Sequence, residues 1–194
     1  MKSIKNIGLY WRTIKYLRPI QIFNRIYRKL FFPKFLSKKT LQRSNFNFPN
    51  YELFNSQSDI KSNTFTFLNS KKNLTFPQDW NNKKIPLLWT YNLHYFDDLL
   101  ASNISFNEKK SHIQRWIKEN PYKSRGPAWD PYTLSIRIVN WIKFFSKEQN
   151  ITDIEISSLL EQIRCLNRTL EYHLLGNHLL ENAKALIFSG LFFN

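Results

Sequence analysis

Apolar and polar residues alternate with helical spacing over much of the chain, most clearly after residue 87. Intervals of one, three and four separate the apolar residues of one long stripe: Ile156, Leu159, Leu160, Ile163, Leu166 and Leu170. This spacing predicts an amphipathic helix with one buried face. Similar patterns predict consecutive helices over residues 92–101, 107–119, 131–148, 153–174 and 177–192.

The predicted ends of these helices leave only short connections. Thr152 or Asp153 is suited to cap the helix over 153–174, and Gly176 is suited to end it. Consecutive long helices with short loops indicate a helical bundle or an α/α toroid rather than a fold with a parallel sheet. We therefore expect a mainly α fold. The last predicted helix ends in a dense apolar run, which needs a neighbour to cover it.

The first part of the chain is a basic arm. Residues 3–17 and 20–32 show helical spacing and are separated by Pro19, so residues 1–32 are expected to form two helices. Before Glu52 there are 12 Lys or Arg and no acidic residue, whereas the remainder has 17 basic and 14 acidic residues. The positive electrostatic field of such an arm attracts polyanions of any kind, so it does not identify a particular ligand. An amphipathic pair lying on a membrane surface is the alternative.

A polar connector over residues 33–86 separates this arm from the helical part. Residues 64–68 and 74–76 alternate aromatic and polar side chains, and residues 69–73 between them are polar. The pattern predicts one small β-hairpin near residues 64–76.

Composition narrows the class of protein. With 42% hydrophobic and 16% aromatic residues, the chain has enough apolar surface to bury a core. A single cysteine, Cys165, excludes an internal disulfide and a cysteine-based zinc site. No apolar run approaches the roughly 20 residues that span a bilayer, and no secretory signal pattern is present. We therefore expect a cytoplasmic chain without a transmembrane segment.

Candidate chemistry is densest in residues 176–182 (GNHLLEN). On a helix, Glu181 follows Asn177 by four residues and His178 by three, so all three side chains share one face. Glu181 is then placed to orient the imidazole, while Asn177 offers two N–H donors without a charge. The alternative is structural: Asn177 caps a helix and His178 is an interior histidine. His173 and His178 lie about 140° apart around a helix, so no metal site is predicted.

Two further clusters combine aromatic rings with polar groups. The first covers residues 89–97 (WTYNLHYFD), and the second begins at residues 129–132 (WDPY) and continues to Trp141. Rings with hydrogen-bonding ends suit the faces and edges of sugars, and they equally suit a core whose polar tips find partners. Arg137 is expected to pair with an acidic group, either of a substrate or of the protein.

Together, these motifs resemble the N-terminal part of the heparinase II/III-like family. The resemblance rests on residues 89–97, 129–141 and 176–182, in that order, with support from residues 10–30. It implies that residues 87–194 begin an α/α toroid that is incomplete here. In the family a C-terminal β-sheet domain follows, which the matched stretch does not include.

The family contains lyases that cleave uronic-acid-containing polysaccharides by β-elimination, without a cofactor. The resemblance implies that Asn177 neutralises the uronate carboxylate and that His178 assists as donor or base, with Glu181 behind it. The substrate-binding residues would then be Tyr91, Asn92, His94, Tyr95, Trp129, Tyr132 and Arg137. The family's tyrosine acid or base lies beyond the matched stretch, so this chain alone is expected to be inactive and to need the remainder of the gene product.

Two other functions remain open. A non-catalytic module would grip an acidic polysaccharide in the same cleft without cleaving it. A nucleic-acid-binding protein would use the basic arm, but the sequence holds no helix-turn-helix, zinc or RNA-binding motif, so no specific nucleic acid is expected.

Overall fold

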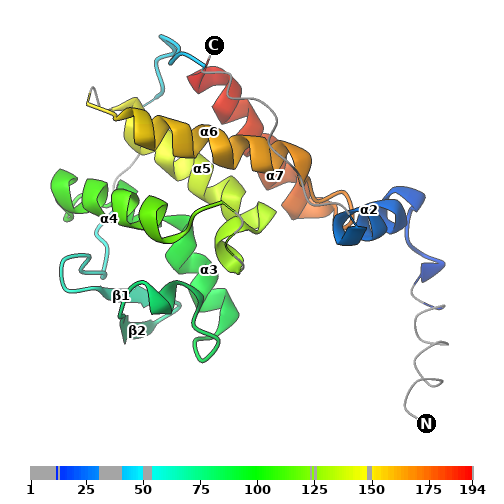
Figure 1. Cartoon of the computed structure of the whole chain (residues 1–194), viewed down its shortest axis with the longest axis horizontal. Coiled ribbons are helices and arrows are strands. Elements are labelled where there is room, and N and C mark those ends of the chain that lie inside the picture. Colours follow the sequence, from blue (N-terminus) through cyan, green and yellow to red (C-terminus); the bar gives the residue numbers. More distant parts are fainter. Residues whose placement is uncertain are drawn as a thin grey trace.

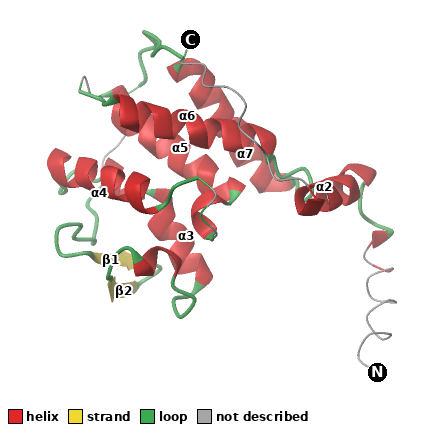
Figure 2. Ribbon diagram, in the orientation of Figure 1, coloured by secondary structure: helices red, strands yellow, loops and turns green. Residues whose placement is uncertain are grey.

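The computed structural model describes residues 12, 14–30, 41–49, 54–122, 124, 126–147 and 150–193. Most of the predicted helix over 3–17, the end of the predicted helix over 20–32, and residues 33–40 and 50–53 of the connector lie outside these residues. Figure 2 shows that helices dominate the described part of the chain and that the strands are confined to one hairpin. The predicted mainly α class is confirmed.

The described elements follow one another in the order shown in Figure 1. The helices are α2 (Pro19–Leu30), α3 (Leu87–Tyr95), α4 (Phe106–Glu119), α5 (Pro131–Ser146), α6 (Asp153–Arg168) and α7 (Gly176–Phe192). The strands are β1 (Thr64–Phe67) and β2 (Ser70–Asn73), and the short 3₁₀ segments are η1 (Gln78–Asn81), η2 (Asp97–Leu100) and η3 (Pro127–Trp129). No helix among the described residues is long and apolar enough to cross a membrane.

The predicted hairpin forms, but its turn is shorter than expected. β1 pairs with β2 in antiparallel fashion, with Thr64 opposite Asn73 and Phe67 opposite Ser70. The two intervening residues, Leu68 and Asn69, both have positive φ, as tight two-residue hairpin turns require. Residues 70–73, which were expected to belong to the turn, therefore form the strand β2. Lysine is compatible with the exposed positions of this strand.

The bounds of α3, α6 and α7 differ from the predicted ones. α3 begins at Leu87 rather than at residue 92, and it ends at Tyr95 because Phe96 adopts a left-handed conformation with φ of 61°. α6 ends at Arg168 rather than at residue 174, and a turn follows it. Gly176 is the first residue of α7 and does not end the preceding helix. A glycine with positive φ is equally compatible with either helix end, so sequence spacing could not separate the two.

The starts of α4 and α6 follow the capping rules closely. Ser105 and Glu108 form a capping box at α4, and Thr152 and Glu155 form one at α6. In each pair the hydroxyl accepts from the third helical N–H, and the carboxylate accepts from the capping residue's N–H. The prediction that Thr152 caps α6 is confirmed.

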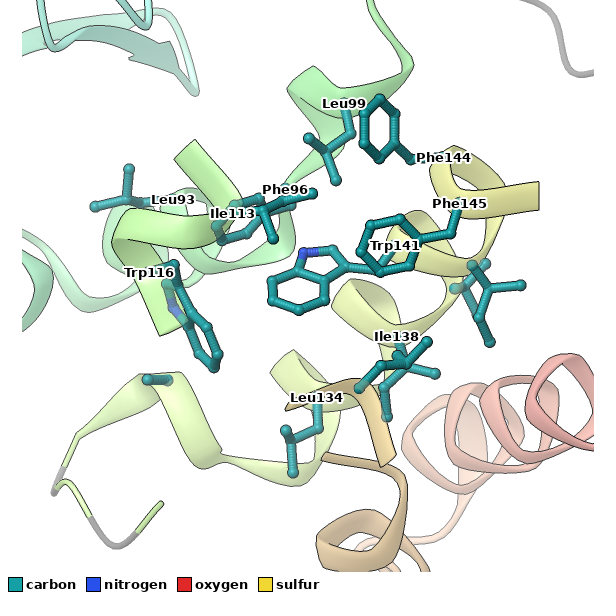
Figure 3. Close-up of a cluster of buried hydrophobic side chains, with 14 of the residues drawn as sticks. Leu93, Phe96, Leu99, Ile113, Trp116, Leu134, Ile138, Trp141, Phe144 and Phe145 are labelled. Atoms are coloured by element: carbon teal, nitrogen blue, oxygen red, sulfur yellow. The ribbon is translucent and has the colours of Figure 1, made fainter. Parts of the chain in front are cut away.

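The core is built around α5, which packs against α3, α6 and α7. Trp141 lies at its centre, with ring centroids 5.6 Å from Phe96 and 5.5 Å from Trp116 (Figure 3). All three side chains are buried, so aromatic rings form the centre of the core. α5 thereby fixes the relative positions of α3 and α7, which both carry candidate site residues.

The apolar end of α7 is covered in part by residues from much earlier in the chain. The backbone N–H of Ser44 donates to the carbonyl of Phe192 at 2.9 Å, and the ring of Phe48 lies 5.7 Å from that of Phe188. Phe192 is buried as a result. The expected neighbour therefore comes from residues 41–49, although Ile187 remains exposed on the other side of the helix.

Candidate functional site

A cavity of about 470 Å³ lies where the start of α5, the start of α7 and one side of α3 meet. Its lining comes from four segments of the chain: Leu88, Tyr91 and Tyr95 of α3; Asp130 to Thr133 at the start of α5; Glu171, His173 and Leu174 after α6; and Asn177 and His178 of α7. Each of the three sequence motifs contributes to this one cavity. We refer to it below as the α3/α5/α7 pocket.

His178 is held in this pocket by Glu171. Its Nδ1 lies 3.2 Å from Oε2 of Glu171, a carboxylate that is only 5% exposed. Because an ionised carboxylate only accepts hydrogen bonds, Nδ1 is the donor of this pair, and Nε2 is the ring nitrogen left for a ligand. The arrangement provides an oriented imidazole with a basic nitrogen.

The predicted contact between Glu181 and His178 is wrong. Glu181 instead forms an ion pair with Lys184, one turn further along α7. Helical spacing correctly makes Glu181 a neighbour of His178, but Glu171 approaches the imidazole from the turn that precedes the helix. Glu171 is therefore the residue that sequence reasoning missed. It lies outside α7, so no helical spacing rule connects it to His178.

A buried hydrogen-bond network supports Glu171. The side-chain oxygen of Asn182 accepts from the Glu171 backbone N–H at 2.8 Å, and its amide group donates to the Glu171 carboxylate at 3.3 Å. The same amide group donates to the hydroxyl of Ser135 at 2.9 Å, which itself donates to the carbonyl of Pro131. Asn182 and Ser135 are fully buried. This network joins α7 to α5 directly beneath the pocket and holds Glu171 in place.

Three tyrosines from two of the motifs complete the polar lining. The hydroxyl of Tyr91 donates to Asp130 at 2.8 Å, and the ring of Tyr132 lies 4.6 Å from the imidazole of His178. The pKa of Tyr91 is raised mainly by burial and, to a smaller extent, by the hydrogen bond to Asp130. The pKa of Tyr95 is raised to about 12, again mainly by burial, with smaller contributions from the nearby Tyr132 and Asp97. Tyr91 and Tyr95 are therefore protonated at neutral pH and act as donors rather than bases.

Asn177 stands at the mouth of the pocket. It is exposed, and its side chain makes no hydrogen bond with the described residues. The N-cap of α7 is Leu175, so the structural alternative in which Asn177 caps the helix is wrong. Its two amide N–H groups are free to meet an anionic or carbonyl oxygen of a ligand.

The backbone between Glu171 and Asn177 is strained. Leu175 has φ of 62° and ψ of −156°, a region that side-chain-bearing residues rarely adopt, and Gly176 follows with φ of 56°. Two successive positive φ values turn the chain sharply, so that the residues before and after the turn face the same cavity. Strain of this kind concentrates at functional sites.

Two of the predicted substrate-binding residues are buried in the core instead. His94 is fully buried, with Nε2 at 2.8 Å from the Trp80 carbonyl and Nδ1 accepting from the Trp116 indole. Burial, with a smaller effect of the Arg137 charge, lowers the pKa of His94 to about 3. The position of His94 on α3 turns it away from the pocket, because Tyr91 and Tyr95 occupy the facing side.

Arg137 is also fully buried and does not pair with an acidic group. It donates to the side chain of Gln162 and to the carbonyls of His94 and Ala128, and it lies 4.0 Å above the ring of Trp116. These neutral acceptors and the aromatic face together satisfy the guanidinium. Its role is to connect α5, α6 and η3.

The two remaining predicted residues lie elsewhere. Asn92 donates to the carbonyl of Leu88 and lines a second cavity of about 510 Å³, next to the β-hairpin. Trp129 packs against Trp116 and Tyr122, and its indole donates to the carbonyl of Asn120. In each of the motifs 89–97 and 129–141, some residues therefore line the α3/α5/α7 pocket and others lie elsewhere in the fold.

The pocket's charged groups are acidic. Its described lining contains the carboxylates of Asp130 and Glu171 and no Lys or Arg. Any recognition of an anion in the pocket therefore depends on the Asn177 amide, the tyrosine hydroxyls and the His178 imidazole.

No group of three or more metal-binding side chains occurs in the described part of the chain. Comparisons with protein-family models, curated proteins and solved structures find no match for this chain.

Proposed function

We propose that this chain is part of a polysaccharide lyase of the heparinase II/III-like type, and that the α3/α5/α7 pocket binds a uronic acid residue of an acidic glycan. The observation that carries the proposal is the arrangement of Asn177 and His178 beside Tyr91, Tyr95 and Tyr132 around one cavity. Amide donors, an oriented imidazole and protonated tyrosines are the groups that β-elimination from a uronate requires. The proposal includes an α/α toroid, for which the succession of helices α3 to α7 is the support.

The reaction removes the proton at C5, breaks the bond between C4 and the glycosidic oxygen, and forms a double bond between C4 and C5. In this pocket Asn177 donates hydrogen bonds to the uronate carboxylate, which makes the C5 proton more acidic. Nε2 of His178 accepts that proton, while Glu171 holds Nδ1 and stabilises the resulting imidazolium. A tyrosine hydroxyl, kept protonated by burial as at Tyr95, donates a proton to the departing oxygen.

The test is incubation of the protein with a panel of uronate polymers, with ultraviolet absorbance of the unsaturated product as the readout. Product is expected with at least one polymer when the full-length gene product is tested, and Asn177→Ala and His178→Ala in that protein are each expected to lower its rate by about 100-fold or more. Asn92→Ala is the matched control, because Asn92 lies on the same helix as Tyr91 but lines a different cavity. Absence of product with every polymer, for the chain and for its full-length gene product, contradicts the proposal.

A second function is favoured by the protonated tyrosines. With the pKa of Tyr95 at about 12, its hydroxyl binds a sugar well but is a weak acid for protonating the departing oxygen. A module that binds an acidic glycan without cleaving it would use the same lining. Titration calorimetry separates the two: glycan binding without product formation supports the binding module, and binding accompanied by unsaturated product supports the lyase.

A further inference from the structure

Helix α2 carries an apolar stripe that is exposed to solvent. Five apolar residues recur at intervals of three, three, one and three, which places them along one side of the helix: Ile20, Phe23, Ile26, Tyr27 and Leu30. All five are exposed, from 42% for Tyr27 to 70% for Leu30. An exposed apolar stripe of this density indicates a surface that is covered by a membrane or by another molecule.

The same helix is basic on its other side and in the residues leading to it. Arg25 lies two residues from Phe23, on the opposite side of the helix, and is exposed. Lys15 and Arg18 immediately precede the helix and are exposed as well. No acidic residue occurs before Glu52, so nothing in this part of the sequence offsets the positive charge.

α2 is attached to the rest of the molecule close to the candidate site. The side-chain amide of Gln21 donates to the carbonyl of His173 at 3.3 Å, and His173 lines the α3/α5/α7 pocket. Figure 1 shows α2 projecting beside the connection between α6 and α7, away from α3 and α4. Its 12 residues are too few to cross a bilayer but suit a helix that lies in the plane of a membrane surface.

We propose that α2 is a membrane-surface helix whose apolar stripe inserts into the interface of an anionic lipid bilayer. The acyl region takes up the stripe around Phe23 and Ile26, while the anionic headgroups attract Arg25 and the basic residues beside it. A nucleic acid matches the charge but offers no apolar phase for five side chains. A second copy of this chain offers an apolar stripe but brings the same positive charge, since each copy carries a net charge of +15.

The experiment is flotation of the whole chain with lipid vesicles. One set contains phosphatidylcholine alone, and the other contains phosphatidylcholine mixed with phosphatidylserine. Partitioning into the anionic vesicles is expected to be about tenfold stronger or more, and to weaken with added salt. Phe23→Ser combined with Ile26→Ser is expected to reduce it by about tenfold or more, because the two side chains no longer enter the apolar phase.

Matched variants identify the surface responsible. Leu180→Ser combined with Ile187→Ser removes two equally exposed apolar residues of another helix, α7, and is expected to leave partitioning unchanged. Arg25→Gln is expected to weaken partitioning, whereas Lys61→Gln, an exposed charge near the hairpin, is not. Circular dichroism of each variant establishes that it is folded, which the exposure of all these side chains favours.

Four results would overturn the proposal. The first is equal partitioning into neutral and anionic vesicles. The second is vesicle binding that survives the Phe23 and Ile26 substitutions. The third is self-association, detected by light scattering, that those substitutions abolish while vesicle binding is absent, because a second copy would then be what covers the stripe. The fourth is strong binding of duplex DNA without vesicle binding, because the basic arm would then be a nucleic-acid-binding segment.

Discussion

Glu171 and His178 meet across the strained turn that begins α7, with 3.2 Å between the carboxylate Oε2 and the imidazole Nδ1. The contact gives the imidazole a fixed orientation toward the pocket, and it depends on a carboxylate that is itself held by Asn182. Removing this buried carboxylate takes one hydrogen bond from each of its two side-chain partners, His178 and Asn182.

Glu171→Ala is therefore expected to lower the free energy of unfolding by about 2–4 kcal/mol, since His178 and Asn182 each lose a partner. Glu181→Ala is the matched control, because Glu181 pairs with the half-exposed Lys184, and its effect is expected to stay within about 0.5 kcal/mol. Urea unfolding of both variants measures the difference. Equal losses would show that Glu171 is not the carboxylate that holds the imidazole.

Two asparagines of the same helix are expected to behave in opposite ways. Asn182 is fully buried and bonded to Glu171 and Ser135, so Asn182→Ala should destabilise the fold by about 2–4 kcal/mol. Asn177 is exposed, so Asn177→Ala should leave stability within about 0.5 kcal/mol. Glycan affinity measured by calorimetry is expected to fall about tenfold in Asn177→Ala. An unchanged affinity would remove Asn177 from the binding site.

Two glycines at opposite ends of α7 should respond to alanine with opposite signs. Gly176 has φ of 56°, so Gly176→Ala places a side chain in a left-handed conformation and is expected to cost about 1 kcal/mol. Gly190 lies inside the helix with open space around it, so Gly190→Ala is expected to stabilise by about 0.5–1 kcal/mol. Thermal unfolding of the two variants gives both signs. A stabilising Gly176→Ala would mean that the turn before α7 is not strained.

Acid is expected to destabilise the fold through two buried histidines. Burial, as the larger effect, lowers the pKa of His94 and of His112 to about 3, whereas an unfolded histidine titrates near 6.5. The unfolded chain therefore binds more protons, and stability falls as the pH is lowered from 6.5 toward 3. Each histidine contributes a slope of about 1.4 kcal/mol per pH unit within that window.

The variant His112→Leu isolates one of these contributions. Because the leucine cannot titrate, the loss of stability between pH 6.5 and pH 4 is expected to be shallower by about 1.4 kcal/mol per pH unit than in the parent chain. The free energy of unfolding from urea titrations at several pH values is the measurement. A slope that does not change on substitution would mean that His112 is protonated in the folded protein.

Much of the local structure follows from the sequence alone. The apolar spacing of α4, α5 and α7, the capping box at Thr152 and the presence of a hairpin all reflect interactions among residues close along the chain. The sequence also identified Asn177, His178, Tyr91, Tyr95 and Tyr132 as candidates, and all five line one pocket.

Tertiary structure decided which polar residues face the pocket and which are core. His94 and Arg137 have the residue types of a binding site, but the packing of α3 against α5 buries them and supplies Trp80, Gln162 and backbone carbonyls as partners. The carboxylate that holds His178 is Glu171 because the turn after Arg168 folds back onto α7. Helical periodicity describes neighbours within one element only, so contacts across a turn or between helices arise from packing that no local pattern encodes.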